Sequence, residues 1–391
     1  MRPTIIATLF SLLSTTAAFA QKVGDRIVVT AEDAQLKTKT NTVGIVRRGS
    51  ILTVENLNGE WSWVIFSSRH ETVEGWINRR DVIPFEKALE FFNKGLGRNP
   101  NAEFYTIRGT IWMEKQDYDK AIADFNAAIR LEPKSANAHS ARNLARHKRG
   151  DFDKAIVNYG QPIRLDPKHA VSFYNRGLAR HKRGEFDKAI ADFDQAIRFD
   201  PKHANAYSAR GVAWQNKGEF VRSIADFGEA IRIDPQQAAF HGNRGIAWYK
   251  QGQYDKASAD WNAAIRLDPK DLHSHYALAW LLATCPDDKY RDGKRAVELA
   301  TNACEVSGWK NAYGVGALAA AYAESGDFEN AVKWQEEFLR LGSENDQKKW
   351  GFLLELYKSG KPFRERGSEF REPRQEFRFG GESRYSAAYV A

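Results

Sequence analysis

The sequence predicts a small all-β domain followed by an all-α solenoid of stacked helix pairs. Two observations carry this prediction. Five prolines stand 34 residues apart, at Pro133, Pro167, Pro201, Pro235 and Pro269, and each closes a segment of similar sequence. A constant period of this length is typical of a helix–turn–helix unit that buries its apolar face by stacking on its neighbours. The second observation is a series of short β-branched and aromatic runs between residues 22 and 84, separated by turn residues.

Composition indicates an ordinary soluble protein with more than one structural unit. The chain has 391 residues, of which 28% are charged and 42% hydrophobic, and this length exceeds what one ordinary core accommodates. The formal net charge of +8 permits contact with acidic partners. It is too small an excess for a nucleic-acid-binding chain of this length, so we expect no nucleic-acid partner.

The first 20 residues have the pattern of a signal peptide. Arg2 supplies the positive start, residues 5–13 form an apolar run, and residues 18–20 read Ala-Phe-Ala, which is a typical cleavage site. The apolar run is too short to span a bilayer, which argues against a membrane anchor. We therefore expect an exported protein, periplasmic or secreted, with no transmembrane segment after cleavage of residues 1–20.

Neither a catalytic site nor a cofactor is expected. The sequence contains no Gly-rich phosphate loop, no G-x-S-x-G elbow and no H-E-x-x-H, which are patterns that carry chemistry in many enzymes. The two cysteines, Cys285 and Cys304, fall at opposite ends of two predicted antiparallel helices, beyond the roughly 7 Å that a disulfide spans. We expect two free, buried thiols, and no metal site accompanies them because no CxxC or paired-His spacing is present.

The all-β segment, residues 21–84, resembles a known family. Its five expected strands cover residues 27–29, 44–46, 51–54, 61–65 and 75–77. The stretches Asn-Gly-Glu-Trp-Ser-Trp-Val and Glu-Gly-Trp-Ile are similar to those of bacterial SH3-like domains, which implies a small β-barrel. Members of that family often bind cell-wall peptides or act as docking modules, which makes Trp61, Trp63 and Trp76 a candidate binding face. The alternative is that the alternating tryptophans face one core.

The rest of the chain divides by the 34-residue period. Residues 85–101 predict a helix that caps the array and joins it to the β domain, and the array itself covers residues 102–360. Its expected units are 102–135, 136–169, 170–203, 204–237, 238–271, 272–311 with an insertion, 312–345, and a capping helix at 346–358. Pro and Gly interrupt residues 361–391, so this tail is expected to be disordered. Within it, Phe363, Phe370 and Phe377 stand seven residues apart, which hints at a binding segment.

The repeats resemble tetratricopeptide repeats. In the unit at 170–203, the small, aromatic and proline positions of that motif are occupied by Gly177, Gly184, Phe186, Ala189, Phe193, Ala196 and Pro201. The physical roles agree, because Gly177 and Ala189 are small where two helices approach, and Gly184 suits a left-handed helix stop. The resemblance implies a right-handed superhelix whose concave groove, lined by the first helix of each repeat, holds peptides or proteins.

Carried over residue by residue, the resemblance places a set of polar and aromatic side chains in this groove. They are His147, Lys148, Tyr174, His181, Lys182, Gln215, Tyr249 and Lys250. Residues 136–169 hold seven Lys or Arg against three Asp, and the runs Arg-His-Lys-Arg at 146–149 and 180–183 are the source of this charge. An acidic peptide, a C-terminal carboxylate or an anionic polymer suits such a surface. The alternative is a solvated helix end that complements its own dipole.

A polar pairing recurs inside the repeats. Arg precedes the first-helix Gly position where family members usually have an apolar residue, and an acid or Asn stands sixteen residues later. The pairs are Arg108 with Asp124, Arg142 with Asn158, Arg176 with Asp192, Arg210 with Asp226, and Arg244 with Asp260. Where Arg becomes Leu278 the partner becomes Leu299, so the two positions change together. This indicates contact between the two helices of one repeat, against the alternative of arginines that grip a ligand.

The second repeat departs most from the pattern. Asn143 replaces the small residue, and Pro162 stands where other repeats have Ala. Proline lacks the N–H that a helix interior needs, so we expect a bend in the second helix of this repeat.

Two functions remain open from the sequence. The first is a non-catalytic scaffold that binds peptides or proteins in the groove. The alternative is a cell-envelope module in which the SH3-like domain binds wall polymer, such as peptidoglycan, and the array acts as a spacer.

Overall fold

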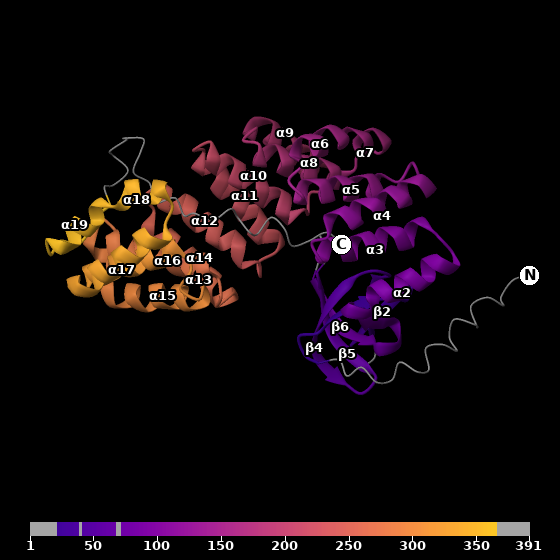
Figure 1. Ribbon diagram of the computed structural model, residues 1–391, viewed down its shortest axis with the longest axis horizontal. Helices are drawn as coiled ribbons and strands as arrows, with labels where there is room; N and C mark the ends of the chain where they lie inside the picture. The colour runs from indigo at the N-terminus through magenta and orange to yellow at the C-terminus, as the bar shows by residue number, and fades with distance from the viewer. Residues whose placement is uncertain (1–21, 39–40, 68–71, 366–391) are drawn as a thin grey trace, which may run out of the picture. The chain divides into compact units, whose positions relative to one another are not determined.

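The computed structural model describes residues 22–38, 41–67 and 72–365. In this part of the chain an antiparallel sheet is followed by an array of helices (Figure 1). The chain divides after Arg183 into two compact units, referred to below as the first and second unit. The predicted signal peptide and the tail beyond residue 365 lie outside the described residues.

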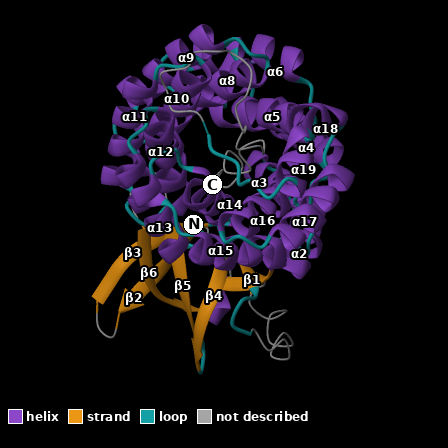
Figure 2. Ribbon diagram, turned by 90° about the vertical axis from the view of Figure 1, so that its left-hand side faces the viewer, coloured by secondary structure: helices purple, strands orange, loops and turns teal. Residues whose placement is uncertain are grey.

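The N-terminal sheet has seven strands in the described residues, drawn in orange in Figure 2. They are β1 (Arg26–Val29), β2 (Asp33–Thr38), β3 (Asn41–Arg47), β4 (Ile51–Asn58), β5 (Trp61–Ser67), β6 (Thr72–Asn78) and β7 (Val82–Pro84). Their order across the sheet is β3-β2-β6-β5-β4-β1-β7, with antiparallel pairs. The SH3-like assignment itself stays a prediction.

The expectation of five strands was wrong by two, β2 and β7. Strand β2 has only Ala34 and Leu36 directed to the core among polar neighbours, so its composition hides it. Strand β7 is three residues long and owes its conformation to pairing with β1, where Val28 stands opposite Ile83. A partner strand, rather than local propensity, decides both cases.

Helix α2 (Phe85–Arg98) covers the range of the predicted capping helix. Its buried face carries Phe85, Ala88 and Phe92, which pack with Val28 of β1 and with Ile111 of the first repeat. One apolar cluster therefore joins the sheet to the helical array within the first unit.

The first unit continues with the first two repeats and the opening helix of the third. Its helices are α3 (Ala102–Glu114), α4 (Tyr118–Leu131), α5 (Ala136–Lys148), α6 (Phe152–Asn158), α7 (Gly160–Leu165) and α8 (Ala170–Lys182). Each repeat expected to have two helices has them, except that the second helix of the second repeat is divided into α6 and α7.

Pro162 explains this division. Because Pro162 has no N–H, it donates no hydrogen bond to the carbonyl of Asn158 four residues earlier. Helix α6 ends at Asn158, and α7 begins at Gly160. The helix is therefore interrupted at Tyr159, and the predicted bend stays a prediction. Next to it, Asn143 and Tyr159 are fully buried, and the Tyr159 hydroxyl has no hydrogen-bond partner in the described part of the chain.

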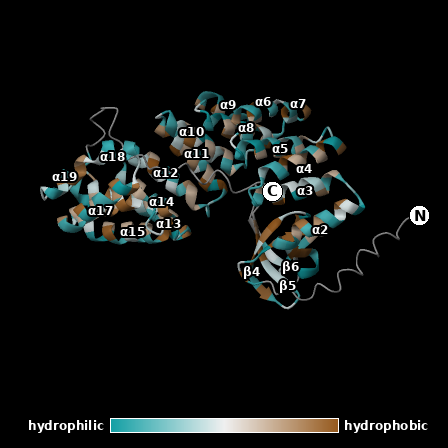
Figure 3. Cartoon of the chain, in the orientation of Figure 1, coloured by the Kyte–Doolittle hydropathy of each residue, from teal (hydrophilic) through white to brown (hydrophobic). Residues whose placement is uncertain are grey.

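The second unit carries the remaining repeats. Its helices are α9 (Phe186–Phe199), α10 (Ala204–Asn216), α11 (Phe220–Ile233), α12 (Ala238–Lys250), α13 (Tyr254–Leu267), α14 (Leu272–Thr284), α15 (Gly293–Val306), α16 (Ala312–Glu324), α17 (Phe328–Leu341), α18 (Glu344–Trp350) and α19 (Phe352–Lys358). In Figure 3 hydrophobic and hydrophilic residues alternate along these helices, as expected where one face is buried.

Small residues set the distance between the two helices of a repeat. A Cβ at Gly245 would lie 2.6 Å from Nε1 of Trp261, and one at Gly211 would lie 3.1 Å from the ring of Phe227. Gly218 and Gly252 end their helices at φ values of 77° and 72°, in the left-handed region that Gly adopts without steric cost. The small and turn positions of the motif therefore have the physical roles that the sequence assigned to them.

The far end of the array is closed by two short helices rather than the one expected at 346–358. Helices α18 and α19 meet at Gly351, and a Cβ there would lie 2.7 Å from the carbonyl oxygen of Gln347. Trp350, Leu353 and Tyr357 are buried against the last repeats, which covers their apolar face. Cys285 and Cys304 are buried in this unit as free thiols.

Residues 361–365 do not behave as the start of a disordered tail. Phe363 packs against Trp280 and Trp350, and Glu365 donates its backbone N–H to the carbonyl of Thr284 at 2.9 Å. The sequence missed this because Pro362 and the polar residues around Phe363 suggest an unstructured chain, whereas the aromatic partners come from helices far away in sequence.

Candidate functional site

The candidate site in the first unit consists of His147 and Lys148 on α5 and of Tyr174, His181 and Lys182 on α8. We call these five residues the stripe. His147, Lys148 and Lys182 lie close enough for both lysine charges to act on the imidazole. Lys148 is half-buried and Lys182 is exposed, so one cation lies deep in the stripe and the other at its surface. Tyr174 is half-buried on α8.

The two histidines of the stripe are neutral at pH 7. Burial lowers the pKa of His147 to about 4, and the nearby charges of Lys148 and Lys182 act in the same direction. Burial, with Lys182 adding to it, also lowers the pKa of His181 to about 4. The positive charge of the stripe therefore comes from its lysines, with uncharged imidazoles beside them.

The surroundings of Lys148 disfavour the charged form of its side chain. Burial lowers the pKa of its ammonium group, Glu114 partly opposes this, and Lys182 adds to it. An anionic group placed between the two lysines would relieve their repulsion.

The outer arginines of the two basic runs have a structural role instead. Arg149 pairs with Asp119 and Asp151, and Arg183 pairs with Asp153. The Arg149–Asp119 and Arg183–Asp153 pairs each join a repeat to the one before it across thirty residues of sequence, so these arginines are committed to stacking. Both arginines are exposed at the C-terminal ends of their helices, so the alternative of a solvated helix end stays a prediction beside these pairs.

A sequence signal for these ion pairs exists and was missed. Lys217 pairs with Asp187 in the same relation. One repeat later the acid is replaced by Val221 and the cation position holds Gln251. At this step both positions lose their charge, but they belong to successive repeats and so escape a comparison made within one repeat.

In the second unit the predicted groove residues differ in their exposure and in their contacts. Gln215 donates its side-chain N–H to the carbonyl of Asn243 at 2.8 Å, and Lys250 is half-exposed. Tyr249 is only 7% exposed and packs against Tyr254 and Trp261, with ring centroids 5.6 and 5.8 Å apart. Its assignment to the ligand groove is therefore corrected, because these aromatic neighbours draw the ring into the packing between helices.

Three of the predicted Arg–Asp pairs are two-pronged. In each, the Nε and Nη2 groups of Arg donate to the two oxygens of one carboxylate. The distances are 2.8 and 2.6 Å for Arg108–Asp124, 2.9 and 2.6 Å for Arg210–Asp226, and 2.8 and 2.8 Å for Arg244–Asp260. The aspartates are buried, and each pair joins the two helices of one repeat. Arginines held in this way have their donors directed at the protein, not at a ligand.

The pKa shifts differ between the pairs, because burial outweighs the hydrogen bonds from Arg210 and raises the pKa of Asp226. Burial by itself would raise the pKa of Asp260, but the hydrogen bonds from Arg244 and His241 outweigh it and hold the pKa below its usual range. The hydrogen bond to Asp124 raises the pKa of Arg108.

Two of the predicted pairs have a different outcome. Arg142 donates to the side chain of Asn126 at 3.1 Å, and Asn158 donates to the carbonyl of Lys154, so the pairing of Arg142 with Asn158 was wrong. Asn158 is the last residue of α6, and its side chain bonds back to that helix. Arg176 and Asp192 belong to different units, and their pairing stays a prediction.

The tryptophans of the sheet lie on its outer face. Trp61 and Trp63 are half-exposed, whereas Ser62 and Val64 between and after them are buried. The alternative that these tryptophans face the core was therefore wrong, because the core takes the other set of alternate residues.

These tryptophans form part of a larger apolar surface. Trp63 stands opposite Trp76 on the adjacent strand, with ring centroids 5.2 Å apart in an edge-to-face arrangement. The Nζ of Lys37 lies 5.7 Å from the ring of Trp61, and the nearby Ile65 is 41% exposed. We call Trp61, Trp63 and Trp76 the tryptophan face.

Neither a metal cluster nor a membrane-crossing helix is found over the described ranges. No group of three or more His, Cys, Asp or Glu side chains there is arranged to hold an ion. No helix among the same residues combines the length and the apolar character that crossing a bilayer requires.

Comparison with protein families identifies the repeats. The family model described as TPR repeat matches residues 109–148, 144–184 and 179–218, and the model described as Tetratricopeptide repeat matches residues 238–271. A search of curated proteins finds no significant match.

Several solved structures are similar to this chain. The APC/C hetero-tetramer Cut9-Hcn1 is similar with a TM-score of 0.55 and 16% identity, over 70% of this chain and 52% of that chain. Yeast Tom70 has a TM-score of 0.49 and 20% identity, over 70% of this chain and 59% of that chain. YrrB is described as a TPR protein with an unusual peptide-binding site. It has a TM-score of 0.38 and 19% identity, over 48% of this chain and 98% of that chain. At 16% identity, the similarity to Cut9-Hcn1 concerns the fold alone. Residues 109–218 and 238–271 of this chain therefore match tetratricopeptide repeats, and an antiparallel β sheet precedes them.

Proposed function

We propose that the protein is a non-catalytic scaffold that binds peptides or proteins in the groove of its repeats, in an extracytoplasmic compartment. The observation that supports this most is the pair Lys148 and Lys182 on the first helices of successive repeats, beside the neutral His147 and His181. The signal-like pattern of residues 1–20 supports the location.

The arrangement favours a carboxylate ligand. Arg149 and Arg183 pair with aspartates of the array. The charge of Lys182 lowers the pKa of Lys148. An acidic side chain or a C-terminal carboxylate placed between these lysines lowers their repulsion, and the flat neutral imidazoles accept apolar groups next to it.

Reversing the two lysine charges is expected to weaken binding of an acidic peptide about tenfold or more. Attraction becomes repulsion in Lys148→Glu/Lys182→Glu, and each factor of ten corresponds to about 1.4 kcal/mol. The measurement is fluorescence anisotropy of the full chain with a labelled peptide of alternating Glu and Phe, at two salt concentrations.

The matched control is Lys154→Glu/Lys168→Glu. Both residues are exposed and belong to the first unit, and the net charge changes by the same amount. Equal weakening in the two variants would show charge attraction without a defined site and would contradict the proposal.

A second candidate function is binding of cell-envelope polymer, and the exposure of the tryptophan face favours it. Exposed aromatic surface on a soluble domain commonly marks a binding site. The full chain is expected to be retained by purified wall polymer, and Trp63→Ser/Trp76→Ser to lose that retention, while Lys148→Glu/Lys182→Glu keeps it. Retention that survives the tryptophan substitutions would remove this face from consideration.

A further inference from the structure

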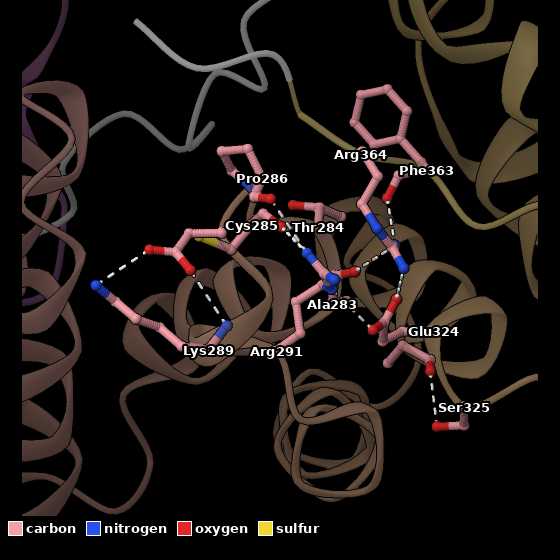
Figure 4. A network of polar contacts seen from close by, with 12 residues as sticks. Ala283, Thr284, Cys285, Pro286, Lys289, Arg291, Glu324, Ser325, Phe363 and Arg364 are labelled. Carbon is pink, nitrogen blue, oxygen red and sulfur yellow. Dashed lines mark hydrogen bonds and ion pairs between the residues drawn. The ribbon is translucent and has the colours of Figure 1, made fainter.

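The chain that follows α19 lies against the ends of α14 and α16. Arg364 forms an ion pair with Glu324, with 2.5 Å between Nη2 and Oε2. The backbone N–H of Glu365 donates to the carbonyl of Thr284 at 2.9 Å, and Figure 4 shows Arg364 directed at Glu324 between the two helix ends. Carbonyl groups at a helix C-terminus lack partners within the helix and carry partial negative charge. A cationic, extended segment suits them.

This contact falls on the groove positions of the last two repeats. Thr284 and Glu324 occupy the thirteenth place of their repeats, counted from residues 272 and 312. The same place in the second and third repeats holds Lys148 and Lys182. The segment therefore lies where a groove ligand is expected, and the charge there is negative instead of positive.

The carboxylate of Glu324 lies beside two guanidinium groups, those of Arg291 and Arg364. Arg291 donates its Nε to Oε1 at 3.1 Å, and carbonyl oxygens of the preceding turn hold Arg291 through its Nη1 group. The Glu324 side chain is only 13% exposed. Oε2 has no hydrogen-bond partner in the described part of the chain but lies beside Nη2 of Arg364. The second guanidinium therefore supplies a counter-charge to a buried carboxylate.

An aromatic cradle stands next to the carboxylate. The ring of Phe363 lies 5.9 Å from Trp280, 6.2 Å from Trp350 and 5.9 Å from Phe352, measured between centroids. Trp280 and Trp350 are buried. An aromatic ring followed directly by a guanidinium therefore fits the two halves of the site in this order.

The sequence beyond this contact repeats the same dipeptide. Phe-Arg-Glu stands at 363–365 and again at 370–372, and Phe-Arg stands at 377–378. Three copies at a spacing of seven residues are more than closing the end of the array requires, because one copy already covers Trp280 and Trp350.

We propose that Trp280, Glu324, Trp350 and Phe352 form a recognition site for peptide segments in which Phe is followed by Arg. The first copy of the motif in this chain fills the site as a tethered competitor. The inference rests on the proposed groove function and names the ligand class for its last two repeats. Because the tether is only a few residues long, the effective concentration of the internal motif is in the millimolar range, and an external Phe-Arg segment must displace it.

The test uses the full chain in a form whose own Phe-Arg motifs no longer occupy the recognition site, called the emptied chain. Phe and Arg of all three motifs are replaced by Ala, so that no internal copy competes. The probe is the labelled peptide Gly-Ser-Glu-Phe-Arg-Glu-Pro-Arg, and the control peptide has Arg-Phe in reversed order with the same composition. The emptied chain is expected to bind the probe at least tenfold more tightly than the wild type does, and at least tenfold more tightly than it binds the control peptide.

Two further variants make the result specific. Glu324→Gln in the emptied chain is expected to weaken the probe about tenfold, and Lys148→Glu/Lys182→Glu in the emptied chain to leave it unchanged. Should circular dichroism show that loss of Phe363 unfolds the cap, the variant with only the three arginines replaced takes its place. Absence of binding up to millimolar peptide, or equal binding of the reversed peptide, would overturn the inference. Acidic-peptide binding at Lys148 and Lys182 that persists in that case leaves the proposed function standing.

Discussion

Asp260→Ala is expected to lower the free energy of unfolding by about 3 kcal/mol. The substitution removes the carboxylate that accepts both donors of Arg244 at 2.8 Å and also contacts His241. A guanidinium that is three-quarters buried is then left without its counter-ion in the packing layer between α12 and α13. Urea unfolding monitored by circular dichroism measures the change.

The informative comparison is Arg244→Leu/Asp260→Leu. Removing both charges leaves no uncompensated group, and apolar replacement of a buried pair is often neutral or stabilising. The chain already contains this solution, because Leu278 and Leu299 occupy the two positions one repeat later and both belong to the apolar cluster there. If the double variant loses as much stability as the single one, the pair is not the cause.

Lowering the pH from 6.5 to 5 is expected to destabilise the first unit by about 3 kcal/mol through His147 and His181 together. Burial lowers the pKa of each imidazole to about 4 in the folded protein, against about 6.5 in the unfolded chain. Below pH 6.5 the two histidines are therefore protonated in the unfolded chain while they are still largely neutral in the folded protein. The contribution of each histidine is fully present above pH 6.5 and is lost as the pH falls toward 4.

The surroundings of His147 account for the size of this effect. Its Nδ1 atom has no hydrogen-bond partner in the described part of the chain, its ring packs edge-to-face on Phe152 at 5.2 Å, and two lysine charges lie close by. These surroundings disfavour the imidazolium of His147, so its protonation costs stability.

The measurement is the urea midpoint between pH 7.5 and 5 for the wild type and for His147→Gln/His181→Gln. The variant is expected to show a flatter dependence on pH. A residual slope is expected in both proteins, because burial also lowers the pKa of His139. Identical slopes would show that the two histidines do not carry the effect. The interval ends at pH 5 because carboxylates begin to titrate below it.

Much of the array was predictable because its information is periodic. Repetition exposes positions where a small residue, a turn Gly or a Pro is required, and comparison within one chain separates these from chance. The two-pronged pairs of Arg108, Arg210 and Arg244 were visible for the same reason, since Arg and acid change together along the chain.

The candidate site was less predictable. Tyr249 occupies a groove position by sequence, yet Trp261 and Tyr254 draw its ring into the packing between helices. His147 and His181 look cationic in a run of basic residues, yet burial makes them neutral. Burial depends on neighbours contributed by other repeats, and no single position shows it.

By itself the sequence determined the repeat length, the order of a β domain before a helical array, the irregular helix at Pro162 and the Arg–Asp partners inside three of the repeats. Each of these depends on the backbone chemistry of single residues or on contacts at a constant separation. Only the tertiary structure decided which face of the sheet carries the tryptophans, which basic residues join successive repeats, and that Phe363 and Arg364 lie against Trp280 and Glu324. These depend on residues up to 83 positions apart, whose meeting follows from the stacking of the repeats and leaves no local pattern.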